Sequence, residues 1–126
     1  MNLEILNKTI LLVEDDKAIV RMLARRLKKA GYNLYVAENG QSGHLQILSI
    51  CPDLVLMDLH MPVMDGIEAT RKLRADGYTG LICALTASAT GDDIKKSMQA
   101  GCDYFIAKPI GIDFEDCIQD MLGETS

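Results

Sequence analysis

Five short apolar runs, each followed by a segment of helical character, constrain the fold of this chain more than any other feature. The runs are mostly apolar and partly β-branched, which is typical of strands buried inside a parallel sheet. They cover residues 9–13, 33–37, 54–58, 81–85 and 104–107, and the helices after them are expected at about 17–30, 41–49, 67–75, 91–100 and 114–122. This alternation predicts an α/β fold with a five-stranded parallel sheet and helices on both faces.

Turn and capping residues agree with these boundaries. Gly31 and Gly77 follow the expected ends of the first and third helices, where a left-handed residue is favoured. Pro52 blocks the continuation of the second helix. Asp16 and Asp113 stand where a side chain caps the start of the first and last helices.

Polar side chains with functional chemistry stand at the carboxyl ends of four of the strands. They are Glu14 and Asp15 after the first strand, Asp58 at the third, Thr86 at the fourth and Lys108 at the fifth. In an open α/β sheet the functional crevice lies beyond the carboxyl ends of the strands, so these groups should meet there. Crowded carboxylates repel one another unless a cation lies among them. An ammonium and a hydroxyl at the same edge indicate that an anion also comes there, and phosphate is the obvious candidate.

Composition excludes several classes of protein. The chain has 126 residues and a net charge of −5, which fits one domain and disfavours bulk binding of nucleic acid. No apolar run approaches the roughly 20 residues that span a bilayer, and no basic-then-apolar leader is apparent. The four cysteines show no C-x-x-C spacing, and Cys83 reads as an apolar core residue. We therefore expect a cytoplasmic protein in a reducing compartment.

Four motifs together resemble the receiver domain of two-component response regulators. They are residues 10–16 (ILLVEDD), 56–66 (LMDLHMPVMDG), 84–87 (ALTA) and 107–110 (AKPI), and the resemblance covers about residues 9–122 of a single domain spanning 1–126. It implies a flavodoxin-like (βα)5 fold with strand order 2-1-3-4-5.

The resemblance assigns Asp58 as the phosphoacceptor, a carboxylate nucleophile that forms an aspartyl phosphate. It assigns Glu14 and Asp15 to a Mg²⁺ site, since hard oxygen ligands suit that ion. Direct ligation is expected from Asp15, Asp58 and the backbone carbonyl of His60, with Glu14 acting through water. Asp16 is at least as well explained as a helix cap as by a metal role.

The remaining site residues are assigned in the same way. Lys108 neutralises a phosphoryl oxygen, and its bond to Pro109 is expected to be cis. Thr86 donates its hydroxyl to the phosphoryl group and acts with Phe105, the family's rotating aromatic, as the switch. Phe105 lacks the hydroxyl of the tyrosine found in many relatives, so packing alone must stabilise an inward state.

Two further residues are expected to tune the lifetime of the phosphoryl group. His60 and Ser88 lie two residues after Asp58 and Thr86, where side chains screen or orient the hydrolytic water. A bulky His60 and a short Ser88 predict slow self-dephosphorylation. His60 is not expected to bind zinc, because the other histidine, His44, lies on a different element.

The expected function is a receiver that takes a phosphoryl group from phosphohistidine onto Asp58 with Mg²⁺ and then shifts between two pre-existing conformations. The partners implied are a histidine kinase or a histidine phosphotransfer domain, and a downstream protein or attached effector domain. No nucleic-acid or membrane contact is expected, and no enzymatic activity beyond its own phosphorylation and dephosphorylation. The wording of residues 59–66 resembles receivers attached to hybrid sensor kinases, so either a stand-alone receiver or part of a longer protein is possible.

Three alternatives remain open. A pseudo-receiver that serves only for docking predicts a broken acidic pocket, whereas the key positions here are intact. A phosphatase of the haloacid dehalogenase type needs a second Asp where this chain has His60. A flavodoxin needs a hydroxyl- and glycine-rich loop after the first strand, where Glu14, Asp15 and Asp16 would repel a flavin phosphate.

Overall fold

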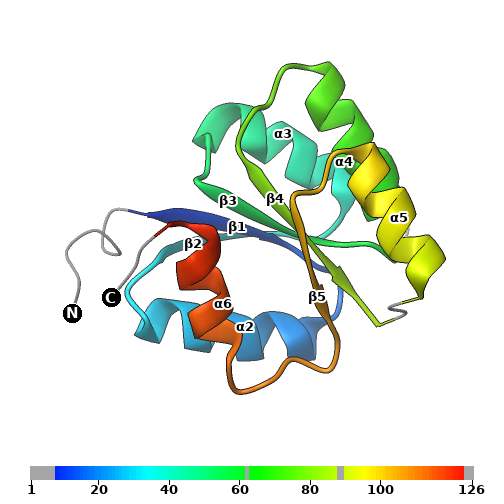
Figure 1. Ribbon diagram of the computed structural model, residues 1–126. Coiled ribbons are helices and arrows are strands. Elements are labelled where there is room, and N and C mark those ends of the chain that lie inside the picture. The colour runs from blue at the N-terminus through cyan, green and yellow to red at the C-terminus, as the bar shows by residue number, and fades with distance from the viewer. Residues whose placement is uncertain (1–7, 62, 88–89, 124–126) are drawn as a thin grey trace.

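One parallel sheet of five strands, in the order β2-β1-β3-β4-β5, forms the centre of the molecule (Figure 1). The computed structural model describes residues 8–61, 63–87 and 90–123. The strands are β1 (Thr9–Val13), β2 (Asn33–Ala37), β3 (Leu54–Asp58), β4 (Leu81–Thr86) and β5 (Tyr104–Ala107). The helices are α2 (Lys17–Lys29), α3 (Gly40–Ile50), α4 (Gly66–Ala75), α5 (Gly91–Ala100) and α6 (Phe114–Met121). The predicted strand–helix alternation and strand order are confirmed.

The helices cover both faces of the sheet, with α2 and α6 on one side and α3, α4 and α5 on the other (Figure 1). Successive side chains of β1 point to opposite faces. Ile10 and Leu12 pack in the core beneath α2 and α6, with Leu23 of α2. Leu11 and Val13 pack in the core on the other side. Burial on both faces explains why the central strands are apolar except at their ends, where Thr9, Asp58 and Thr86 stand.

Helix boundaries follow the capping residues closely. The Asp16 carboxylate accepts hydrogen bonds from the backbone of Ala18 and Ile19, so its predicted role as a cap is confirmed. Gly31 and Gly77 have φ of 102° and 93°, as expected for residues after helix ends. Most element ends coincide with the sequence-based bounds, and the others, such as the end of β4 at Thr86, differ by one residue.

The prediction that the Asp113 side chain caps the last helix is wrong. Asp113 occupies the N-cap position of α6, but its side chain makes no capping hydrogen bond. Its backbone has φ −89° and ψ 9°, whereas the N-cap geometry that directs a carboxylate onto the first turn is extended. The loop after β5 therefore sets this helix start.

The cysteines are all free, as the lack of paired spacing suggested. Cys83 is fully buried on β4, and its burial raises the pKa of the thiol, so it acts as an apolar core residue. Within the described part of the chain, no helix has both the length and the apolar character needed to cross a membrane.

A single guanidinium ties together the loops at the amino edge of the sheet. Arg74, near the end of α4, donates Nη1 to the carbonyls of Tyr78 and Gly80, both at 2.8 Å. It donates Nε and Nη2 to the Gly101 carbonyl at 3.0 and 2.9 Å, and Nη2 to Asp103 at 2.9 Å. All the N–H donors of the group are thus engaged, and the loops before β4 and β5 are fixed to α4.

Replacing Arg74 by Met should therefore lower the free energy of unfolding by about 2 kcal/mol or more, because loop carbonyls lose charge-assisted donors. The matched control is Arg71→Met on the exposed side of the same helix, which should change stability by no more than about 0.5 kcal/mol. Urea unfolding of both variants measures the difference. Equal losses in the two variants would show that the Arg74 contacts add nothing to stability.

Candidate functional site

The predicted acidic residues come together at the carboxyl edge of the sheet. Asp58 is the last residue of β3, and Glu14 directly follows β1. These two carboxylates are buried, with exposed fractions of 3% and 1%, while Asp15 is exposed. Ligand oxygens of Glu14, Asp15 and Asp58 lie within 4.8 Å of one another. Three hard oxygen donors in this arrangement, one of them open to solvent, fit a divalent cation such as Mg²⁺.

Lys108 supplies a positive charge to the same cluster. Its Nζ lies 2.8 Å from Glu14 Oε1 and 3.3 Å from Asp58 Oδ1. Its backbone N–H donates to the Thr86 carbonyl at 2.8 Å, and the Lys108–Pro109 bond is cis, as expected. Desolvation works to lower the pKa of Lys108, but the hydrogen bond to Glu14 and the charge of Asp58 outweigh it, so the pKa is raised.

The loop that carries Lys108 is held against α2. Arg26 Nη2 donates to the Gly111 carbonyl at 2.9 Å, and Arg26 Nε donates to Glu115 at 2.8 Å. The guanidinium also lies over the Phe114 ring. These contacts join α2 to the loop after Lys108 and to the first turn of α6.

Among the carboxylates of the site, Glu14 has a clearly raised pKa. Burial of its carboxylate, with the neighbouring Asp58 next in importance, raises the pKa of Glu14 to about 7, although Lys108 acts in the opposite direction. One ammonium therefore does not fully compensate the two buried carboxylates. A cation at this cluster would remove the remaining excess of negative charge.

Gly66 allows α4 to pack directly on the backbone of the Asp58 strand end. A Cβ at this position would lie 2.2 Å from the Asp58 carbonyl oxygen. The Gly66 N–H donates to the Leu59 carbonyl at 3.1 Å, and the buried Thr70 hydroxyl donates to the Gly66 carbonyl at 2.7 Å. In the sequence, Gly66 stands out only as the last residue of the motif at 56–66. The sequence signal for a helix that begins at Gly66 is the preceding Asp65, which caps α4.

The other predicted site residues are placed as follows. Thr86 is fully buried at the end of β4, beside the Lys108 backbone. Phe105 lies on β5 and is 43% exposed, which is an outward position. His60 is exposed, and its backbone N–H donates to Asp58 Oδ1 at 3.3 Å. Ser88 lies outside the described residues.

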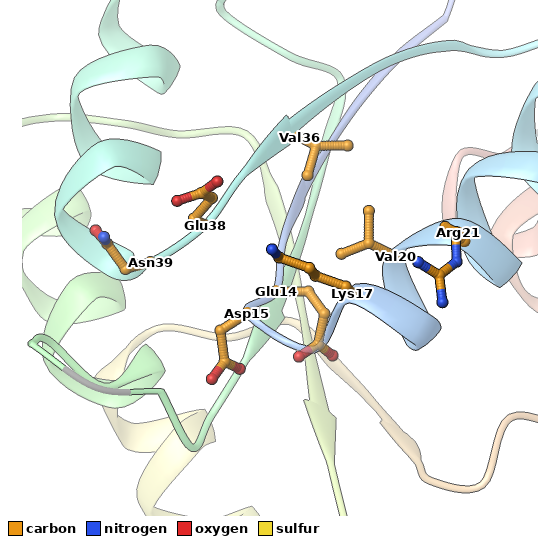
Figure 2. A pocket seen from close by; sticks show the side chains of 8 residues that line it. All are labelled: Glu14, Asp15, Lys17, Val20, Arg21, Val36, Glu38 and Asn39. Atoms are coloured by element: carbon orange, nitrogen blue, oxygen red, sulfur yellow. The ribbon is translucent and has the colours of Figure 1, made fainter.

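The site is open on both sides of α2. On one side, a pocket of about 500 Å³ lies between the start of α2 and the end of β2, and Figure 2 shows Glu14 and Asp15 at one side of it with Lys17 between them and Val36. On the other side, an apolar hollow is lined by Ile19, Met22, Ala87, Lys108, Pro109 and Ile110. Both Asp15 and Lys108 can therefore be reached from outside.

Comparisons with known proteins agree with this arrangement. A family model described as "Response regulator receiver domain" matches residues 10–119. The chain is 39% identical over 104 residues to the phosphate regulon transcriptional regulatory protein PhoB of Pseudomonas aeruginosa, covering 81% of this chain and 45% of that protein. It is 40% identical over 106 residues to the two-component response regulator ORR41 of Oryza sativa, covering 80% and 83% of the two chains.

A solved structure extends the comparison. The receiver domain of a sensor histidine kinase from Pseudomonas aeruginosa, with a magnesium ion coordinated in its active site cleft, is 33% identical with a TM-score of 0.84. The match covers 92% of this chain and 98% of that one. The chain spans less than half the length of the first curated regulators that it matches, so only this domain is compared.

The raised pKa of Glu14 predicts that the stability of the fold depends on pH. Between about pH 4.5 and 7 the folded chain retains the Glu14 proton that the unfolded chain has released. The free energy of unfolding contributed by this group should therefore fall as the pH rises through that window in the presence of a chelator. Urea unfolding at pH 5, 6 and 7.5 measures the decrease.

Two variants isolate the contribution of Glu14 to that pH dependence. Glu14→Gln should flatten the decrease, whereas Glu38→Gln, which removes an exposed carboxylate beyond β2, should leave it unchanged. An unchanged pH dependence in Glu14→Gln would contradict the assignment of the shift to this residue.

Proposed function

Because the chain belongs to the response regulator receiver domain family, we propose that it accepts a phosphoryl group from phosphohistidine onto Asp58 in two-component or phosphorelay signalling. The observation that carries the proposal is Lys108 Nζ, 2.8 Å from Glu14 and 3.3 Å from Asp58 at the meeting point of three strand ends. We treat residues 9–122 as the core of this single receiver domain.

The transfer step is a displacement at phosphorus. An Asp58 carboxylate oxygen attacks the phosphorus atom as the phosphorus–nitrogen bond of the donor breaks. The electron pair of that bond returns to the imidazole nitrogen, which then takes up a proton, and Asp58 becomes an acyl phosphate. The Lys108 ammonium and the His60 N–H both contact Oδ1 of Asp58, so we assign Oδ2 as the nucleophile.

Asp15, Asp58 and the backbone carbonyl of His60 would hold Mg²⁺ directly, and Glu14 would act through water. The ion would neutralise charge on the phosphoryl oxygens during transfer. Two observations support this assignment. Lys108 already contacts Glu14 and Asp58. Asp15 is exposed, so its carboxylate remains accessible to an ion from solvent.

Lys108 and Thr86 would respond to phosphorylation of Asp58. A phosphoryl group on Asp58 would attract the Lys108 ammonium and the Thr86 hydroxyl, and both lie at neighbouring strand ends. Movement of Thr86 opens a place for Phe105, which is outward in this structure. Ligand-dependent selection between the two arrangements is the proposed output.

The proposed donor is a histidine kinase or a histidine phosphotransfer domain, and the output passes to a downstream protein or an attached domain. The apolar hollow beside Lys108, formed by Ile19, Met22, Pro109 and Ile110, supports a protein donor over a free small molecule. We propose no catalysis beyond the domain's own phosphorylation and hydrolysis, with exposed His60 and with Ser88 tuning the latter. A docking-only pseudo-receiver is disfavoured by the intact cluster, and the phosphatase alternative by an exposed His60 where a second Asp is required.

Phosphorylation should occur on Asp58 alone. Incubation with acetyl phosphate and Mg²⁺ should add the mass of one phosphoryl group to the wild type and none to Asp58→Asn, which lacks the nucleophile. Asp92→Asn, which alters an exposed carboxylate on α5, should be labelled like the wild type. Intact-mass spectrometry reads all three, and labelling of Asp58→Asn would refute the proposal.

Mg²⁺ affinity should depend on Asp15 and not on the neighbouring Asp16. Asp15→Asn should weaken binding at least several-fold because a ligand oxygen loses its charge. Asp16→Asn carries the same change of charge one residue away, but its side chain is committed to capping α2, so the affinity should change much less. Amide shifts in a Mg²⁺ titration give the two affinities, and equal weakening would place the ligands elsewhere.

A further inference from the structure

Val63 has a backbone conformation that its side chain disfavours. Its φ is 72°, in the left-handed region, where a β-branched residue is a genuine outlier. Among the described residues, Cys51 is the other non-glycine residue with positive φ, and it is the left-handed cap of α3. Val63 caps no helix, because it lies in the loop between β3 and α4.

Packing of the Val63 side chain does not offset this strain. The Val63 side chain is 79% exposed, so it gains little from packing. The loop around it is nevertheless firmly held, since Leu59 donates to Leu85 and Gly66 donates to Leu59. Met64, the next residue, packs on the core beneath α3 and α4. Such strain persists where surrounding structure imposes it, and it is concentrated at functional sites.

The position of Val63 indicates which kind of phosphoryl donor it could meet. Val63 lies in the loop that leaves the sheet directly after Asp58, at the carboxyl edge that carries the acidic cluster. Ile112, which is fully exposed, stands on the loop after β5 at the same edge. These two are the most exposed large apolar side chains of the described chain. A small phosphoryl donor has no surface to meet them, whereas a protein that brings a phosphohistidine to Asp58 must cover this edge.

We propose that Val63 is an apolar contact for the protein that carries the phosphohistidine, and that the left-handed backbone holds its side chain outward for that contact. The inference rests on the proposed function and names a residue that recognises the donor. It separates the chemistry at Asp58, which Val63 does not touch, from protein recognition, to which Val63 contributes.

The test compares a small donor with a protein donor on three variants. The small donor is phosphoimidazole. The protein donor is a phosphorylated histidine phosphotransfer domain, chosen from a panel of purified domains as the one that phosphorylates the wild type fastest. Val63→Asn tolerates the left-handed backbone but removes the apolar contact. Val63→Leu keeps an apolar side chain. Leu45→Gln is the matched control, because it removes an exposed leucine from α3.

Val63→Asn should melt several degrees higher than the wild type, because the strain is relieved. Its phosphorylation by phosphoimidazole should stay within about twofold of the wild type. Its kcat/KM with the protein donor should fall at least about fivefold, as expected for the loss of one apolar contact. Val63→Leu should retain the protein-donor rate, and Leu45→Gln should change neither rate.

Several results would overturn the inference. They are an unchanged protein-donor rate in Val63→Asn, a lower melting temperature in that variant, or a wild type that no phosphotransfer domain phosphorylates faster than phosphoimidazole does. Loss of a wild-type dimer in Val63→Asn, seen by sedimentation, would assign the residue to a second copy of the chain instead. A wild type that phosphoimidazole leaves unmodified at Asp58 would refute the proposed function itself, which keeps the two failures distinct.

Discussion

Two carboxylates, Glu14 and Asp58, are buried side by side, and the architecture of the site depends on how their charge is compensated. Burial of an unpaired charge costs several kcal/mol even after the protein relaxes. The fold provides one cation, Lys108, which contacts both carboxylates. With Asp15 included, three carboxylates face one ammonium, so two negative charges remain uncompensated. A divalent cation would balance that excess. Burial, and then the neighbouring Asp58, raise the pKa of Glu14, so the carboxylate form of this residue is disfavoured despite the contact with Lys108.

Only the sheet topology makes this cluster possible. The four strand ends that carry Glu14, Asp58, Thr86 and Lys108 belong to β1, β3, β4 and β5, which are consecutive neighbours in the sheet. Because all the strands are parallel, every carboxyl end lies at one edge. This is why the sequence predicted the convergence: the apolar runs identify the strands, and the polar residue at the end of each run marks the edge. The cap at Asp16 followed from the same kind of local rule.

Other features depend on tertiary contacts that no local pattern contains. Arg74 joins the nearby loop before β4 to Gly101 and Asp103, which are 27 and 29 residues away from it in sequence. An arginine late in an amphipathic helix gives no sign of these contacts. The close approach of Gly66 to the Asp58 backbone depends on how α4 enters the sheet layer. Asp113 fits the sequence rule for a cap, but the loop before it, held by Arg26 through Gly111, imposes another backbone geometry. The left-handed Val63 contradicts the preference of its own residue type, so only the structure reveals it.

The charge balance also explains how such a site becomes a switch in the proposed function. A phosphoryl group on Asp58 replaces one negative charge by about two, distributed over three acceptor oxygens. A cation held by the cluster and Lys108 would then no longer balance its charge, so Asp58 would attract additional hydrogen-bond donors. Thr86 is the hydroxyl best placed to respond, because it ends the strand adjacent to β3 and its backbone carbonyl already accepts from Lys108. A shift of Thr86 would change the packing beside Phe105 on β5, because Phe105 pairs with Ala84, two residues before Thr86 on β4. In the proposed function, a local change of one charge would thereby be transmitted to the outer surface of β5 through two adjacent strands.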